Sequence, residues 1–251
     1  AYEQETPPFS IILMNRVEEC APVRMDAPLN LLAARGSVSL TGCMSAKDTP
    51  LELYDVTSMH DSIILFERAN LMPTANVRQM LAEAASHGSI VLQEMDDHPN
   101  VNEAAARDHY FLFRAVSAVQ TSTKYLADYL RKFNPYVYLF ENQLAELPFA
   151  RTYEGNASQV TIFFGALNRR ADWEPLMPSI NAAIQEHGDR LYFRVVSDYT
   201  FYQQLRTEQK SYVGGTQDGS VVAPYERYVD ELHASDIALL PLNDTEFNRA
   251  K

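Results

Sequence analysis

The sequence predicts an α/β fold made of two doubly wound parallel-sheet domains, the second of them incomplete. Short apolar runs alternate with amphipathic stretches along most of the 251 residues. The runs are apolar throughout, which is typical of parallel strands that are covered by helices on both faces. The alternation stops in residues 143–158, which lack periodicity, and then starts again.

Six apolar runs precede Asn142 and are each long enough to form a strand. Apolar residues at a 3.6-residue period, followed by Gly88, predict a helix over 74–88, and Pro28 near a first turn favours a helix over 28–35. The expected strands lie within 9–15, 37–42, 62–69, 89–97, 117–122 and 137–142. Further helices are expected over 101–115 and 121–133, and a loop over 16–26.

Residues 143–158 contain Pro and Gly and predict a linker between domains 1–142 and 159–251. The second domain holds four expected strands, which is fewer than a doubly wound sheet usually carries. They lie within 160–166, 191–198, 211–215 and 236–243. Helices are expected over 173–187, 199–206 and 223–235.

Composition excludes several classes of protein. A net charge of −12 disfavours nucleic acids and anionic membrane surfaces, because both require clustered Lys and Arg. Cys20 and Cys43 are too few for a disulfide framework, so a reducing cytoplasm is expected. The apolar runs fall short of the ~20 residues that span a membrane, and the acidic start does not resemble a signal peptide.

Ligands of parallel sheets bind at the carboxyl ends of the strands. In "FFGALNRRADW", Gly165 permits close approach of a ligand, and Arg169 or Arg170 can bind phosphate oxygens at a helix start. Asn168 lies in the same turn. The alternative is a surface turn with two solvated arginines.

Two later loops of the second domain are further candidates. Gly214 and Gly215 follow a strand and could lie against a nucleobase, and Asn243 and Lys251 could donate to anionic or sugar oxygens. The alternative for Gly214 and Gly215 is a flexible loop. The alternative for Asn243 and Lys251 is a solvated loop.

In the first domain, "QEMDDHPN" brings carboxylates and an imidazole to a strand end. Asp97 and His98 are candidates for acid/base chemistry. The carboxylates are adjacent in sequence and only one imidazole is near, so no metal site is predicted. Arg24 follows the first strand and is the third candidate. For Asp97 and His98, the alternative is an acidic loop that caps the next helix. For Arg24, the alternative is a surface arginine.

The segments "TIFFGALNRRADWEPLMPSINAAI", "YVGG" and "PYERYVDELHASDIALLPLNDTEFNRAK" follow one another in an order that resembles the nucleotide-sugar half of GT-B fold glycosyltransferases, most of all the retaining group 1 / family 4 enzymes. The resemblance implies two Rossmann-like domains. It also implies a diphosphate held by Gly165, Arg169 or Arg170, and Lys251. Gly214 and Gly215 would then lie beside the base. Asp97 or His98, with Arg24, would face the acceptor.

In that family a Ser, a Lys and a Glu follow the loop that ends here at Lys251, so a chain truncated within its donor domain is expected. The function implied is metal-independent sugar transfer from a nucleotide sugar to a carbohydrate or other hydroxyl acceptor, with retention. The nucleotide sugar is the substrate, and no cofactor is expected. The resemblance fits polysaccharide biosynthesis, and this part of the enzyme alone is expected to be inactive. A two-lobed protein that binds a small ligand, or a scaffold, is the alternative.

Overall fold

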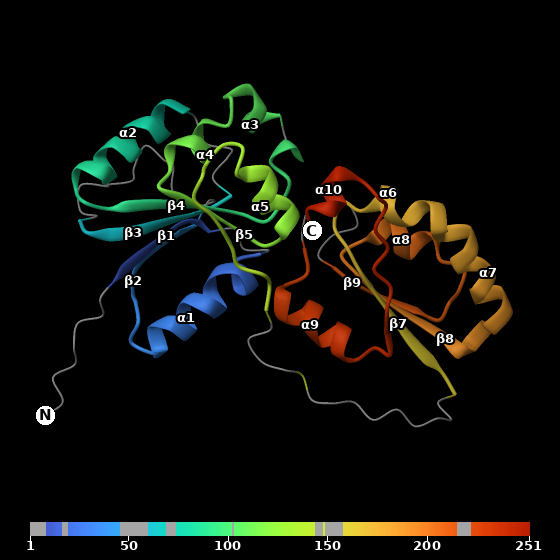
Figure 1. The fold of residues 1–251 in the computed structure, drawn as a ribbon. Coiled ribbons are helices and arrows are strands. Elements are labelled where there is room, and N and C mark those ends of the chain that lie inside the picture. Colours follow the sequence, from blue (N-terminus) through green and yellow to red (C-terminus); the bar gives the residue numbers. More distant parts are fainter. Residues whose placement is uncertain are drawn as a thin grey trace, which may run out of the picture. The chain divides into compact units, whose positions relative to one another are not determined.

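The computed structural model describes residues 9–16, 20–45, 60–68, 74–101, 103–143, 148, 158–214 and 222–251. The chain forms two compact units. Unit 1 comprises Ala1–Leu147 together with Thr245–Lys251, and unit 2 comprises Pro148–Asp244. Each unit contains a fully parallel sheet with helices (Figure 1). The predicted α/β class with two Rossmann-like parallel-sheet domains is therefore confirmed.

Among the residues that the structure describes, the sheet of unit 1 has six strands in the order β2-β1-β3-β4-β5-β6. They are β1 (Ser10–Arg16), β2 (Ser39–Ser45), β3 (Ser62–Glu67), β4 (Ile90–Met95), β5 (Ala118–Thr121) and β6 (Val137–Leu139). The chain moves outward from β1 to β2 and then returns to the other side of β1 with β3. This reversal is a topological switch point, where ligands bind in open α/β sheets.

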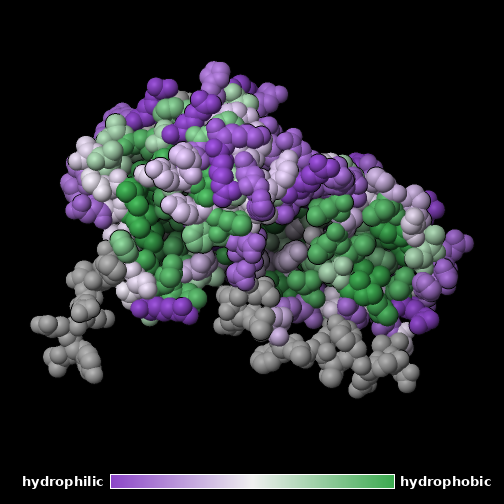
Figure 2. Space-filling model, in the orientation of Figure 1, coloured by the Kyte–Doolittle hydropathy of each residue, from purple (hydrophilic) through white to green (hydrophobic). Residues whose placement is uncertain are grey.

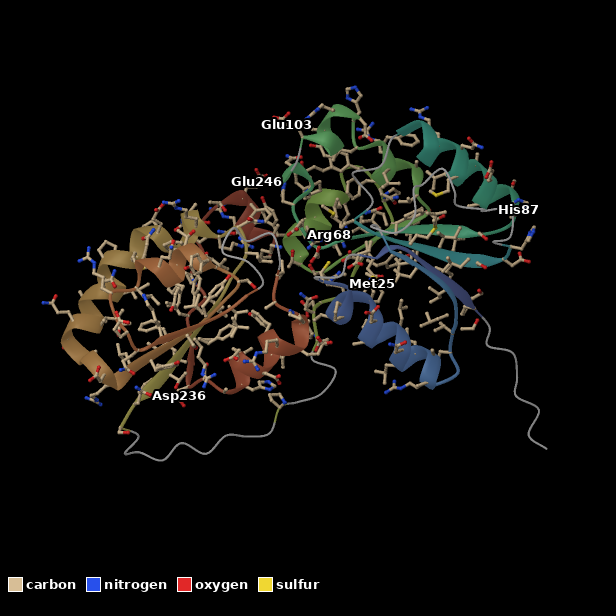
Figure 3. All side chains as sticks on the ribbon, turned by 180° about the vertical axis from the view of Figure 1, so that it is seen from behind. Met25, Arg68, His87, Glu103, Asp236 and Glu246 are labelled. Atoms are coloured by element: carbon tan, nitrogen blue, oxygen red, sulfur yellow. The ribbon has the colours of Figure 1, made fainter. Side chains whose placement is uncertain are left out.

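Helices cover both faces of this sheet (Figure 1). The π-helical turn η1 (Pro22–Asp26) and α1 (Ala27–Ala34) cover one face, where Met25 points toward the strands (Figure 3). The opposite face carries α2 (Thr74–Ser86), α4 (Phe111–Ala115) and α5 (Lys124–Leu130). Successive residues of β1 contribute to the two different cores, because side chains alternate along a strand.

Two predictions about local structure in unit 1 were wrong. Helical structure begins within the expected loop 16–26, where Pro22 opens η1. The expected helix over 101–115 is instead a 3₁₀ turn η5 (Pro99–Val101) and two short helices, α3 (Ala104–Arg107) and α4. His109 and Tyr110 both have φ of 56°, a left-handed conformation that interrupts a right-handed helix.

The described part of unit 2 forms a sheet of four strands in the order β10-β7-β8-β9. They are β7 (Val160–Gly165), β8 (Leu191–Val196), β9 (Lys210–Val213) and β10 (Ile237–Ala238). Its helices are α6 (Arg170–Trp173), η6 (Glu174–Leu176), α7 (Met177–His187), η7 (Gly188–Arg190), α8 (Tyr199–Gln204) and α9 (Tyr225–His233).

Aromatic side chains build much of the core of unit 2. The Phe164 and Phe201 rings stack with their centroids 3.7 Å apart, and the Trp173 ring meets Phe201 edge-on. The neighbouring strand residue, Phe163, packs instead on Tyr228 of α9, with ring centroids 5.1 Å apart. Phe163 and Phe164 thus point to opposite faces of β7. Phe163 packs against α9, and Phe164 packs against the side that carries α6–α8.

The last strand is much shorter than the sequence predicts. The expected strand over 236–243 pairs with β7 only at Ile237 and Ala238, and Pro241 cannot donate to a sheet hydrogen bond. In the segment after β10, Leu240 is 60% and Leu242 57% exposed. Figure 2 shows apolar side chains on the surface of unit 2.

The final seven residues belong to unit 1, although the sequence assigns them to the second domain. They contain the short helix α10 (Glu246–Arg249). Ala250 is fully buried in the main core of unit 1, and its carbonyl oxygen accepts a hydrogen bond of 3.0 Å from the Thr123 hydroxyl. Within the described ranges, no helix is long and apolar enough to cross a bilayer.

Candidate functional site

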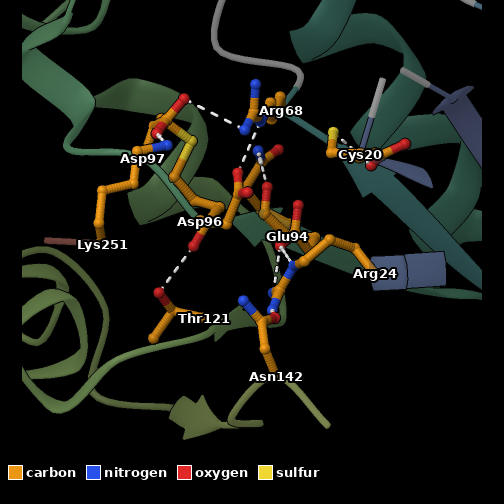
Figure 4. A network of polar contacts seen from close by, with 12 residues as sticks. Cys20, Arg24, Arg68, Glu94, Asp96, Asp97, Thr121, Asn142 and Lys251 are labelled. Carbon is orange, nitrogen blue, oxygen red and sulfur yellow. Dashed lines mark hydrogen bonds and ion pairs between the residues drawn. The ribbon is translucent and has the colours of Figure 1, made fainter. Parts of the chain in front are cut away.

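Charged side chains gather in unit 1 at the carboxyl ends of β3 and β4, next to the switch point (Figure 4). Arg68 donates from Nε to Asp96 at 2.6 Å, and its Nη2 lies 3.1 Å from Asp97. The other carboxylate oxygen of Asp97 forms an ion pair with Lys251. Burial alone would raise the pKa of Asp96, but the hydrogen bond and charge of Arg68 lower it below its ordinary value.

A second pair of side chains, Arg24 and Glu94, is more deeply buried in the same unit. Arg24 Nε donates to Glu94 Oε1 at 2.8 Å, and Nη2 donates to the same oxygen. The third donor, Nη1, contacts Asn142 Oδ1 at 2.5 Å. The Arg24 side chain is 5% exposed and that of Glu94 is fully buried. Burial raises the pKa of Glu94 to about 8, although the charge of Arg24 opposes that shift.

The two ring nitrogens of His98 differ, because within the described residues the buried Nε2 has no hydrogen-bond partner. Its Nδ1 accepts from the Asn100 amide at 3.2 Å, and Nε2 lies 3.3 Å from the Glu246 carboxylate of α10. The ring is 3% exposed and packs on Tyr129. Burial lowers the pKa of His98, which favours the neutral imidazole. These contacts give His98 a role in fastening α10 to unit 1.

In unit 2, a pocket of about 270 Å³ lies between the turn after β7 and the loop after β10. β10 and β8 flank β7 on opposite sides, so the pocket lies at the switch point of this sheet. The lining residues are Phe164, Gly165, Ala166, Leu167, Arg169, Leu239, Leu240, Pro241 and Leu242. The wall is thus mainly apolar, with Arg169 as its charged member.

Asp172 connects the two loops that border this pocket. Its Oδ2 lies 3.4 Å from Arg169 Nη1, and its Oδ1 accepts a hydrogen bond of 3.0 Å from the Asn243 amide. The Asn243 side chain also donates to the Ala171 carbonyl oxygen. Arg170, in contrast, pairs with Glu174 one turn along the exposed surface of the helix. The two adjacent arginines therefore have different environments.

The glycines of the predicted site have tight local surroundings. A Cβ on Gly165 would lie 2.5 Å from the Tyr228 ring and 2.6 Å from the Phe163 ring, so any larger residue would force these rings to shift. A Cβ on Gly214 would lie 2.2 Å from the Tyr212 hydroxyl. Gly215 lies outside the described residues. The helix that follows Arg169, α6, has only four residues, so its dipole adds little at the pocket.

The structure thus divides the predicted residues into groups. Arg24, Asp97, His98 and Lys251 lie in unit 1 near the carboxyl end of β4, and all contact charged or polar partners there. In unit 2, Gly165 and Arg169 line the pocket, Asn168 (φ 55°) shapes the turn between them, and Asn243 binds Asp172. Arg170 and Gly214 do not line this pocket.

Sequence reasoning missed several polar residues of the unit 1 site, namely Glu67, Arg68, Asn142 and Glu246. Glu67 and Arg68 follow a buried apolar run directly, and charged residues at such a strand end are a usable signal. Asn142 and Glu246 gave no signal, because their partners lie 118 and more than a hundred residues away in sequence. In the part of the chain that the structure describes, no three His, Cys, Asp or Glu side chains are grouped to hold a metal ion.

No protein-family model matches the chain, and no curated protein matches it. Among solved structures, one described as an S. aureus MnaA–UDP co-structure is similar, with a TM-score of 0.43 and 11% sequence identity. The alignment covers 90% of this chain and 71% of that chain.

Proposed function

We propose that this chain belongs to a glycosyltransferase that moves a sugar from a nucleotide-sugar donor to a carbohydrate or other hydroxyl acceptor. The observation that supports it is the pocket at the switch point of the unit 2 sheet, with Gly165 and Arg169 in its wall. Open α/β sheets bind nucleotides at this position. The ordered sequence motifs over 159–251 favour a nucleotide sugar over other nucleotides.

Arg169 is the proposed contact for the donor diphosphate. Its guanidinium can bind two phosphate oxygens at once, which a lysine ammonium cannot do in the same planar geometry. Asp172 restrains Arg169 and, through Asn243, the facing loop. A cation held in place in this way stabilises the negative charge that develops on the departing diphosphate. Transfer would then proceed without an obligatory metal ion.

Unit 1 is the proposed acceptor side, with Arg24, Asp97 and His98 as the residues that the family resemblance assigns to it. In the structure, Arg24 and His98 are nearly buried; Arg24 donates to Glu94, and His98 lies beside Glu246. We therefore propose that they position neighbouring groups. Retention of the anomeric configuration is part of the proposal and derives from the same resemblance.

Isothermal titration of the full-length protein with UDP, GDP and ADP tests the donor site. We expect one of these nucleotides to bind, and Arg169→Ala to weaken its binding about 10- to 100-fold, which corresponds to losing a charged hydrogen bond. Arg170→Ala is the matched control and should change the affinity less than about twofold, because Arg170 pairs with Glu174. A folded protein that binds none of the three nucleotides would disprove the proposal.

Turnover distinguishes an enzyme from a two-lobed binding protein. The full-length protein should release the nucleoside diphosphate from a nucleotide sugar, and EDTA should leave that rate unchanged. Tight nucleotide binding with no release from UDP-glucose, UDP-N-acetylglucosamine, GDP-mannose or ADP-glucose would favour the binding protein.

A further inference from the structure

Two histidine rings lie side by side in unit 1, at the amino ends of β3 and β4. His60 precedes β3, and His87 lies between α2 and β4 (Figure 3). Their ring centroids are 4.4 Å apart, and the ring planes meet at 79°. Arg68 and Asp96 follow the carboxyl ends of the same two strands. The histidine pair is therefore separate from the candidate site of unit 1, and the proposed sugar transfer does not use it.

The pairing of the two strands brings these histidines together. The Ser62 amide donates to the Ser89 hydroxyl oxygen at 3.1 Å, across 27 positions of the sequence. His60 and His87 have the same offset, so they occupy corresponding positions before two adjacent parallel strands. The Asp61 amide also donates to the His87 carbonyl oxygen at 3.1 Å. The main chain thus holds the two rings near each other, whatever the strength of their own contact.

Both imidazoles are available to a ligand. Among the described residues, the hydrogen bonds of His60 and His87 involve only main-chain atoms, so no protein group occupies a ring nitrogen. His60 is exposed and His87 is partly exposed, so an ion can reach both rings from solvent. Imidazole nitrogen is a favoured ligand of Zn²⁺, Ni²⁺ and Cu²⁺.

The separation of the rings suits two ligands of one ion. When each metal–nitrogen bond is ~2.0–2.1 Å long and the angle at the metal is about 90–110°, two imidazole centroids lie roughly 4.5–5.3 Å apart. The observed 4.4 Å is close to this range, so a small opening of the pair and rotation of the rings suffice. Asp61 adds a negative charge nearby, because its Oδ1 would lie 2.7 Å from a Cβ on Gly88, the residue after His87. That charge favours a cation over an anion.

We propose that His60 and His87 form a surface site for Zn²⁺ or another divalent cation that prefers nitrogen ligands, with water molecules as the remaining ligands. The described residues contain no group of three metal-ligating side chains, so the ion is held by fewer protein ligands than in a structural zinc site and exchanges with solvent. It joins the segment before β3 to the segment before β4. Because it binds the folded chain, it stabilises unit 1.

Isothermal titration of the full-length protein with ZnCl₂, in a buffer that does not bind metal ions, tests the site. We expect one ion per chain. His60→Gln and His87→Gln should each weaken binding at least about tenfold, since even the loss of a residue that supports a ligand costs about 10- to 100-fold in metal affinity. His187→Gln is the matched control, because His187 is an exposed histidine at the end of α7 in unit 2; it should bind zinc like the wild type. MgCl₂ should not bind at this pair, because Mg²⁺ prefers oxygen ligands.

NMR of isotope-labelled histidine rings locates the ion. ZnCl₂ should shift the ring signals of His60 and His87 together and leave that of His187 in place. Zinc should also raise the unfolding temperature of the wild type more than that of His60→Gln or His87→Gln. In EDTA, all three variants should unfold close to the wild type, because surface substitutions change stability little.

Four results would each overturn the inference. They are a wild type that binds no zinc, a His60→Gln or His87→Gln variant that binds zinc as the wild type does, a loss of affinity in His187→Gln as large as in these two variants, and ring signals of His60 and His87 that respond to MgCl₂ as they do to ZnCl₂.

Discussion

Lys251 and Asp97 form an ion pair although 154 positions separate them in the sequence. The pair joins the last residue of the chain to the carboxyl end of β4 in unit 1. Nearby, Glu246 approaches His98 and Tyr125, and Ala250 is buried in the core. The segment that follows unit 2 is therefore an integral part of unit 1.

Removing this pair should loosen α10 without unfolding unit 1. Lys251→Ala should speed hydrogen exchange in residues 246–250 roughly two- to fivefold, because a partly exposed ion pair contributes up to about 1 kcal/mol. Lys124→Ala removes an exposed pair with Asp128 and serves as the control. Mass spectrometry of exchanged peptides measures the effect. Equal exchange in the two variants would show that the Lys251–Asp97 pair does not hold α10.

Thr123 has two structural roles, so its loss should affect the whole of unit 1. Its hydroxyl caps α5 by accepting from the Leu126 amide at 3.3 Å, and it donates to the Ala250 carbonyl oxygen. Thr123→Ala should lower the free energy of unfolding by about 1–2 kcal/mol. Thr245→Ala removes only the cap of α10 and should change urea-induced unfolding by less. A smaller effect at Thr123 than at Thr245 would contradict this assignment.

Burial of Glu94 should make stability depend on pH. The pKa of Glu94 rises from 4.5 in a free chain to about 8 in the fold, so the folded state holds a proton that the unfolded state releases. The stability that this bound proton contributes is fully present below the Glu94 pKa of the unfolded chain, 4.5. It is lost as the pH rises through the Glu94 pKa of the folded state, about 8. Between about pH 6.5 and 8, the loss should be about 2 kcal/mol.

Urea unfolding at several pH values checks this dependence. Glu94→Gln should remove most of the slope, because glutamine does not ionise. The range stops near pH 8 because burial also raises the pKa of the Cys20 thiol, whose unfolded form begins to ionise above that pH. A wild-type slope that persists in Glu94→Gln would assign the effect to another group.

Asp172 should be essential to the shape of the unit 2 pocket. Asp172→Ala leaves the Asn243 amide without its acceptor and removes a partner of Arg169. We expect unfolding to become easier by about 1–3 kcal/mol and nucleotide affinity to fall together with it. Asp128→Ala, which alters an exposed aspartate, is the control. Unchanged nucleotide affinity in Asp172→Ala would argue that Arg169 does not need this support.

Substitution of Gly165 tests whether packing, or instead the approach of a ligand, requires a residue without a side chain at this position. Gly165→Ala places a Cβ 2.5 Å from the Tyr228 ring, and such overpacking costs about 1–3 kcal/mol. Combining it with Tyr228→Ala should restore part of that loss if the clash is the cause. Calorimetric unfolding of the two single variants and the double variant measures the coupling. Additive effects would point away from the clash with Tyr228.

The sequence alone predicted the α/β class, the six strands of the first half and the four of the second. Runs such as residues 63–66 are apolar throughout, and buried parallel strands favour this composition. It also located the turn with Gly165 and Arg169, because glycine and arginine directly after a strand are recognisable without any partner. It did not predict the break at His109 and Tyr110, since left-handed backbone at such residues depends on their surroundings.

Tertiary structure decided which of the predicted charges act together. Arg169 and Arg170 are adjacent in sequence, yet one lines the pocket and the other pairs with Glu174 on an exposed helix. Lys251 belongs to unit 1, and Glu94 rather than Asp97 keeps a buried oxygen without a partner. The physical reason is that burial and pairing depend on neighbours that are distant in the chain. The Asp97 carboxylate lies beside two cations, Arg68 and Lys251, whereas the Glu94 carboxyl group lies beneath η1. The free energies of these two groups therefore differ with their environments, which local sequence does not encode.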